Sequence, residues 1–112
     1  MRQKTKEVFD HHVKAFIEND LEAVMADYTE ESILITPDVT YNGLDEIKIN
    51  FVSAFKLFPK DSTTFKVSKT VIKKDLAYFI WSAKAPKLEL SFCTDSFVIQ
   101  NGKIIRQTFA GH

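Results

Sequence analysis

Asp95 is the residue of this sequence best placed to do chemistry. It lies in residues 94–104, two β-rich runs joined by an Asn-Gly pair at 101–102, which is the pair best suited to a type I′ turn. Even spacing puts Asp95 on the same face of its strand as Cys93 and Phe97. If that face points inward, a carboxylate lies on an apolar wall, where it needs either a partner or a chemical role.

The register of this hairpin decides whether Asp95 has a charged partner or is free for a chemical role. With a two-residue turn and no bulge, Asp95 lies opposite Thr108, and Arg106 is a diagonal neighbour able to form a salt bridge. A paired Asp95 has a lowered pKa and suits a base or a water-positioning role, whereas an unpaired one suits a neutral acid that donates to an oxyanion. A single bulge would instead turn Gln107 and Phe109 inward.

His12 and Asp38 are the other catalytic candidates. His12 follows Phe9 by three residues and precedes Phe16 by four, on the apolar stripe of a predicted helix. An imidazole in a dry pocket can serve as a donor or a general base, although a core histidine with one hydrogen bond is the alternative. Asp38 is the lesser candidate, because its place after Pro37 also suits an Asx-type turn.

Aromatic side chains are frequent, with ten Phe, three Tyr and one Trp in 112 residues, and they suit either an apolar pocket or a wide filled core. The predicted pocket lining consists of Phe16, Phe51, Phe55, Phe79, Trp81, Phe97, Arg106 and Thr108.

Neither a metal nor a cofactor is expected. One cysteine cannot form an internal disulfide or a Cys-rich zinc site, and we interpret Cys93 as a small buried hydrophobe. The adjacent His11 and His12 do not have the i, i+4 spacing of a helical metal pair.

The elements that must position these residues follow from apolar periodicity. Helical spacing predicts three helices: one over about 5–18, a short one that begins after Asn19 as its N-cap, and one over about 44–58. Strands are expected at 32–37, 65–71, 76–83, 88–100 and 103–110, with a loop at 38–43. The order ααβαββββ predicts one α+β domain spanning 1–112, with three N-terminal helices packed on a curved, mainly antiparallel sheet.

Charge and hydropathy limit the classes of partner and the location that we expect for this protein. Lys plus Arg equals Asp plus Glu, at 15 each, so no net field favours nucleic acid or an anionic membrane. The first residues contain no apolar run, so neither a signal peptide nor a membrane span is expected, and a cytoplasmic location is the default. The run 76–83 is apolar on both faces, which predicts a homodimer through the sheet.

The motifs, in their order, resemble a known superfamily. They are NDLEAV at 19–24, YTEES at 28–32, Pro37, Gly43 with Ile47, KDLA at 74–77, DSF at 95–97 and GKI at 102–104. With the element order, they resemble the SnoaL-like and nuclear transport factor 2-like superfamily, which includes ketosteroid isomerase and scytalone dehydratase. The resemblance implies a cystatin-like, cone-shaped fold, whose members range from enzymes to pure binding modules.

Alignment with ketosteroid isomerase carries three roles onto this chain. The oxyanion-binding Asp falls on Asp95, the oxyanion-binding Tyr falls on His12, and the base falls on Thr36, which cannot serve as one. Asp38 lies two residues beyond Thr36. An Asp95–Arg106 pair would instead resemble limonene epoxide hydrolases. Steroid isomerisation in particular is not implied.

These observations lead to three functional hypotheses. The first is a small-molecule domain with a largely apolar pocket that carries out cofactor-independent acid–base chemistry of the isomerase, dehydratase, cyclase or hydrolase type. The second is a binding module of the same fold without chemistry. The third is a dimeric association domain whose cavity is filled by aromatic side chains.

Overall fold

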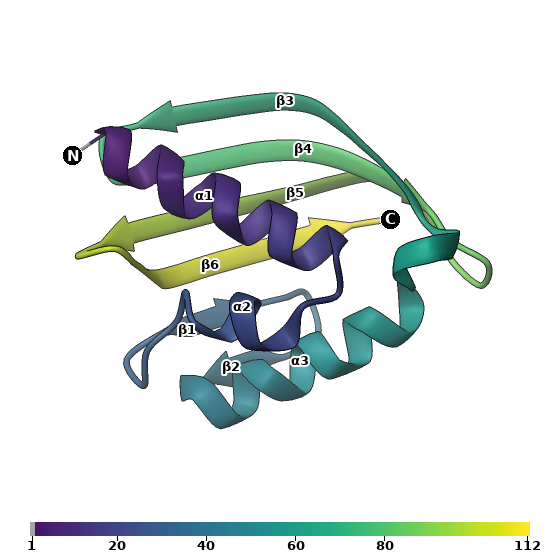
Figure 1. Ribbon diagram of the computed structural model, residues 1–112, viewed down its shortest axis with the longest axis horizontal. Helices are drawn as coiled ribbons and strands as arrows, with labels where there is room; N and C mark the ends of the chain where they lie inside the picture. Colours follow the sequence, from purple (N-terminus) through teal and green to yellow (C-terminus); the bar gives the residue numbers. More distant parts are fainter. Residues whose placement is uncertain (1) are drawn as a thin grey trace.

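Three helices lie against one face of a curved sheet of six strands (Figure 1). The structure is a computed structural model and describes residues 2–112. The elements, in chain order, are α1 (Arg2–Ile17), α2 (Leu21–Met25), β1 (Ile33–Ile35), β2 (Thr40–Asn42), α3 (Gly43–Leu57), a short 3-10 helix (Lys60–Ser62), β3 (Thr64–Lys73), β4 (Leu76–Lys84), β5 (Glu89–Gln100) and β6 (Lys103–Gly111).

The sheet has the strand order β2-β1-β6-β5-β4-β3. The four long strands follow one another as antiparallel hairpins, and β1 joins them by parallel pairing with β6. The predicted α+β cone is therefore confirmed. No helix in residues 2–112 is long and apolar enough to cross a membrane.

Two local predictions for the N-terminal half are wrong. Residues 38–43 were expected to be a loop, yet Thr40–Asn42 forms β2 and pairs with β1, and a three-residue strand is too short to show a period of two. Asp20, not Asn19, caps α2, because its side chain accepts a hydrogen bond from the Ala23 amide (3.0 Å). Asn19 instead takes a left-handed conformation with φ 55°.

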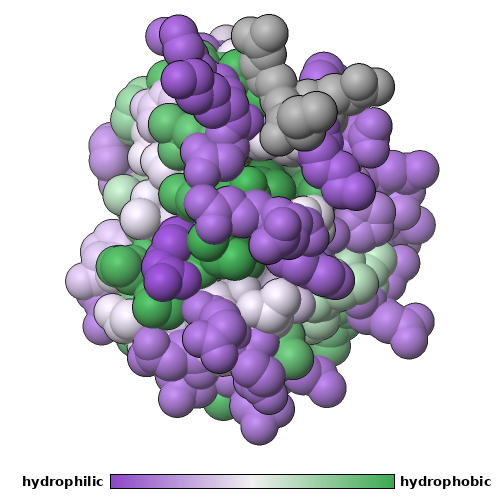
Figure 2. Space-filling view, turned by 90° about the vertical axis from the view of Figure 1, so that its left-hand side faces the viewer, coloured by the Kyte–Doolittle hydropathy of each residue, from purple (hydrophilic) through white to green (hydrophobic). Residues whose placement is uncertain are grey.

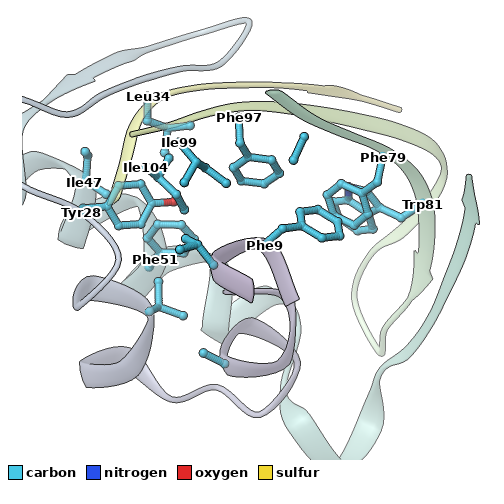
Figure 3. Packing of buried hydrophobic residues seen from close by; sticks show 14 of the residues in the cluster. Phe9, Tyr28, Leu34, Ile47, Phe51, Phe79, Trp81, Phe97, Ile99 and Ile104 are labelled. Atoms are coloured by element: carbon cyan, nitrogen blue, oxygen red, sulfur yellow. The ribbon is translucent and has the colours of Figure 1, made fainter. Parts of the chain in front are cut away.

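The core forms where the helices meet the inner face of β4 and β5 (Figure 3). Alternate side chains of these strands point toward α1, as the period of a strand requires. Phe9 of α1 packs edge-on against Phe79 of β4, at 5.1 Å between ring centroids, and against Phe97 of β5, at 5.7 Å. This contact holds α1 across the sheet and brings its next turn over Asp95.

The β5–β6 hairpin decides which side chains face the helices. Asn101 and Gly102 both have positive φ, at 54° and 77°, as a type I′ turn requires. Beyond the turn, the register shifts by one residue at a bulge beside Val98, so that Asp95 pairs with Phe109 rather than with Thr108.

The bulge reverses the expected facing of β6. Arg106 and Thr108 were predicted to line the pocket, and both are exposed instead. The Arg106 side chain donates to the backbone carbonyl oxygens of Glu31 (3.1 Å) and Ile105 (2.8 Å) and so cannot pair with Asp95. Because one extra residue turns a strand over, Gln107 lies on the inner face, where it is buried.

Candidate functional site

A cavity of about 320 Å³ lies between the C-terminal halves of α1 and α3 and the inner face of the long strands. Among the residues predicted to line a pocket, five do so: Phe16, Phe51, Phe79, Trp81 and Phe97. Phe55 does not line it and packs against Phe16 instead, at 5.6 Å between ring centroids.

The end of the molecule at which β4 begins and β5 ends has a mainly hydrophilic surface, with apolar side chains showing between polar ones (Figure 2).

Asp95 lies at the floor of this cavity with only 6% of its surface exposed. Its neighbours across the sheet are Phe79 on β4 and Phe109 on β6. Two side chains hold the carboxylate, since the Trp81 indole N–H donates to Oδ1 (2.7 Å) and the Gln107 amide donates to Oδ2 (2.9 Å).

Burial raises the pKa of Asp95 from 3.8 to about 6, because the charged form is deprived of water. The hydrogen bonds from Trp81 and Gln107, together with the nearby His12, oppose this rise because they favour the carboxylate. Asp95 is therefore mostly ionised at neutral pH, with a pKa close enough to neutrality for proton transfer. Its two bound donors suit a hydrogen-bond acceptor or a base rather than the neutral acid of an oxyanion hole.

His12 of α1 is 4% exposed and reaches Asp95 through two intermediates. The Tyr28 hydroxyl donates a short hydrogen bond to Gln107 Oε1, and Gln107 in turn donates to Asp95. A hydroxyl can donate only one hydrogen bond, and that of Tyr28 goes to Gln107. In the contact between His12 Nε2 and the Tyr28 oxygen (3.3 Å), His12 is therefore the donor. Burial raises the pKa of Tyr28 well above its ordinary value, and the carboxylates of Asp95 and Asp27 add to this effect.

The polar chain continues from His12 to the surface. Asp27 Oδ2 lies 3.5 Å from His12 Nδ1, which has no hydrogen-bond partner among the described residues. The same oxygen lies 2.9 Å from Nδ1 of His11, whose side chain is half exposed. Asp95 at the cavity floor is thus connected by consecutive polar contacts to solvent beside α1.

Thr36, Asp38 and Cys93 are the remaining residues that the sequence singled out. Thr36, at the position aligned with the isomerase base, lines the cavity, and its hydroxyl donates to the Val39 carbonyl (3.0 Å). Asp38 is exposed in the β1–β2 turn and does not line the cavity. Cys93 is fully buried, and burial together with the charge of Asp95 raises its pKa to about 11, so it is an unreactive thiol.

Sequence reasoning missed most of the polar network around Asp95. In the sequence, Tyr28 carries a signal only as the first residue of the motif at 28–32, Asp27 lies outside every motif, and Gln107 turns inward only if the hairpin contains a bulge. Within residues 2–112, no three His, Cys, Asp or Glu side chains are grouped so as to hold a metal ion.

Comparison with known proteins finds solved structures with the same fold. No protein-family model and no curated protein matches the sequence. An NTF2-like protein of unknown function from Mesorhizobium loti is 19% identical, with a TM-score of 0.80 over 98% of this chain and 92% of that one.

Two structures of candidate enzymes are as similar in fold. A candidate SnoaL-like polyketide cyclase from Shewanella putrefaciens is 15% identical, with a TM-score of 0.80 over 99% of this chain and 80% of that one. A candidate ketosteroid isomerase from Kribbella flavida is 12% identical, with a TM-score of 0.80 over 98% of this chain and 78% of that one. The chain therefore has the fold of the NTF2-like and SnoaL-like superfamily, as the order of its sequence motifs predicted.

Proposed function

We propose that the cavity binds a small, mostly apolar molecule and that Asp95 acts on it as a general base in a reaction that needs no cofactor. The observation that carries this proposal is a carboxylate on an aromatic floor whose pKa is raised to about 6. A base works best when its pKa lies near the working pH, because it is then both ionised and able to take a proton. Isomerisation, dehydration and cyclisation all require such a step.

Trp81, Gln107 and His12 serve Asp95 as positioning residues. Trp81 and Gln107 occupy one acceptor site on each carboxylate oxygen, which leaves acceptor capacity for a proton from a ligand. They also fix the plane of the carboxylate, since both donors come from strands that flank β5. His12 lines the cavity and orients Gln107 through Tyr28.

Proton exchange at carbon tests this proposal without knowledge of the substrate. We expect the protein to catalyse hydrogen–deuterium exchange next to the carbonyl of apolar ketones in heavy water, measured by NMR over a panel of ketones. Asp95→Asn should lower the rate about 100-fold or more, the usual size of a lost general base. Asp38→Asn, at an exposed carboxylate outside the cavity, is the matched control. Full activity of Asp95→Asn would overturn the assignment.

A non-catalytic binding module is the second candidate, favoured by one observation. The position aligned with the isomerase base is Thr36, whose hydroxyl cannot replace a carboxylate. Ligands that bind in the cavity without exchange at carbon, in wild type and Asp95→Asn alike, would favour this reading.

The proposal includes a homodimer through the outer face of the sheet. Tyr78, Ile80 and Val98 are half-buried on that face, alternating with the side chains that point toward the helices. Apolar side chains on an outer sheet face suit contact with a second copy of the same surface related by a two-fold axis.

A further inference from the structure

Asp95 carries a negative charge that no Lys or Arg side chain in the described cavity lining offsets. Among the described residues that line the cavity there is no Lys or Arg. On the sheet, Asp95 is flanked by Phe79 and Phe109 in register and by Cys93 and Phe97 along its own strand. Trp81 and Gln107 donate hydrogen bonds but carry no charge.

The other titratable groups that face Asp95 offset its charge only in part. From α1, only His12 approaches; it favours the Asp95 carboxylate, but its Nδ1 also lies 3.5 Å from the Asp27 carboxylate, so a positive charge on His12 would be shared between two carboxylates. Tyr28, which follows α2, is held protonated by burial, and Cys93 on β5 likewise. The part of α3 that lines the cavity, from Asn50 to Leu57, contributes no titratable side chain to the lining.

We propose that this cavity selects ligands with an ammonium group on an apolar skeleton, the ammonium paired with Asp95 and the skeleton held among the aromatic rings. The inference rests on the proposed function to the extent that the cavity must be the ligand site, and it names the class of ligand. Benzylamine and naphthylmethylamine are suitable probes, because the cavity, at about 320 Å³, is near the lower end of the range for ligand sites.

The chemistry of the walls favours a cation over the alternatives. A buried carboxylate is costly unless an opposite charge accompanies it, and an ammonium supplies that charge together with hydrogen-bond donors. Aromatic rings attract cations because their faces are electron-rich, and Phe79, Trp81, Phe97 and Phe109 all line the cavity together with Asp95. An alcohol can donate one hydrogen bond but leaves the charge of Asp95 unpaired, and a carboxylate ligand is repelled.

Binding of matched probes tests this inference. Trp81 is the only tryptophan of the chain and donates directly to Asp95, so its fluorescence reports on the site. Each probe skeleton, benzyl and naphthylmethyl, is measured as the amine, the alcohol and the corresponding carboxylate. We expect the amine to bind at least about tenfold more tightly than the alcohol at pH 7.5, and the carboxylate to bind more weakly than either.

The advantage of the amine must follow the charge of Asp95. It should decline as the pH falls through about 6, where Asp95 takes up a proton, and it should vanish in Asp95→Asn while persisting in the Asp38→Asn control. His12→Gln removes the neighbouring imidazole, and the decline should remain in this variant. The pH arm uses the wild-type protein, so it holds even if Asp95→Asn does not fold.

Two contrary results are distinguishable. An alcohol that binds as tightly as its amine, or a preference for amines that survives in Asp95→Asn, overturns the inference and leaves the cavity as a ligand site. Absence of binding by every probe of both skeletons removes the ligand site itself, and the proposed function fails together with the inference.

Discussion

At the scale of single residues, the ionisation of Asp95 is the central property. Most buried carboxylates are stabilised by a basic partner that lowers their pKa. Asp95 has only neutral donors within hydrogen-bond distance, from Trp81 and Gln107, and burial therefore dominates and raises its pKa. The charge that makes Asp95 useful as a base or as a partner of an ammonium group thus weakens the fold.

This cost predicts a pH-dependent stability. The pKa of Asp95 rises from 3.8 to about 6, so the native state holds more protons than the unfolded state between these values, and stability falls as pH rises through this window. The loss is about 3 kcal/mol, at about 1.4 kcal/mol for each pH unit. Asp95→Asn should lack it, so that urea unfolding gives the variant an advantage at pH 7 that disappears near pH 4. An advantage independent of pH would contradict the raised pKa.

Tyr28 connects Gln107 to His12, and its hydroxyl is the test of the polar network. Tyr28→Phe leaves Gln107 Oε1 and His12 Nε2 without their partner, and we expect a loss of about 1–3 kcal/mol in the free energy of unfolding. The NMR resonances of the His12 ring should shift as well. Tyr41→Phe, at a half-buried ring on β2, is the control. An unchanged His12 signal in Tyr28→Phe would argue against the network.

At the scale of elements, the junction between α1 and α3 holds two walls of the cavity together. Asn19 follows α1 in a left-handed conformation, and its side chain donates to the Phe58 carbonyl (3.1 Å) and accepts from the Lys60 amide (2.8 Å). These bonds tie the C-terminal end of α3 to the end of α1. Both helix ends line the cavity, so Asn19 sets the spacing of its walls.

A glycine substitution separates the two roles of Asn19, because glycine accepts positive φ but cannot form the side-chain bonds. Asn19→Gly should lower the free energy of unfolding by about 1–2 kcal/mol, as expected when the hydrogen bonds to Phe58 and Lys60 are lost. Asn101→Gly is the matched control, since Asn101 has nearly the same φ, 54°, in the exposed β5–β6 turn. Urea unfolding measures both, and equal effects would show that backbone conformation alone matters at Asn19.

The bulge in the β5–β6 hairpin is the second feature of the elements that determines the site. It places Gln107 beside Asp95 and turns Arg106 to the surface, where the salt bridge of the register without a bulge cannot form. The Asn-Gly turn was predictable from two residues, because both need positive φ. The bulge was not, because a shift of one residue leaves the apolar pattern of β6 nearly as good in either register: Ile104 and Phe109 stand on opposite phases.

At the scale of the whole molecule, the layers leave one sheet face without helices (Figure 1). From Ala77 to Ala83, side chains of β4 alternate between buried ones on the helix side and half-buried ones on the outer face, where Tyr78 and Ile80 are apolar. A two-fold dimer would cover this face and leave the cavity, on the other side of the sheet, free for a ligand.

A charge on the outer face tests the dimer. We expect wild type to have twice the 12.9 kDa mass of the chain by size-exclusion chromatography with light scattering. Ile80→Arg should reduce it to a monomer, because an arginine would be buried unpaired at the interface. Ile49→Arg, at a 61% exposed position on α3, should leave the mass unchanged. A wild-type monomer at micromolar concentration would contradict the proposal.

Local patterns in the sequence were enough to predict the fold. Helical stripes, strand alternation and the Asn-Gly turn place the elements in order and put Asp95 on the same strand face as Cys93 and Phe97. The direction of that face and the chemistry around Asp95 depend on the tertiary structure. Tyr28 and Gln107 are 79 residues apart in the chain, and the bulge, the buried polar network and the raised pKa of Asp95 all depend on contacts that exist only after the sheet and helices have packed.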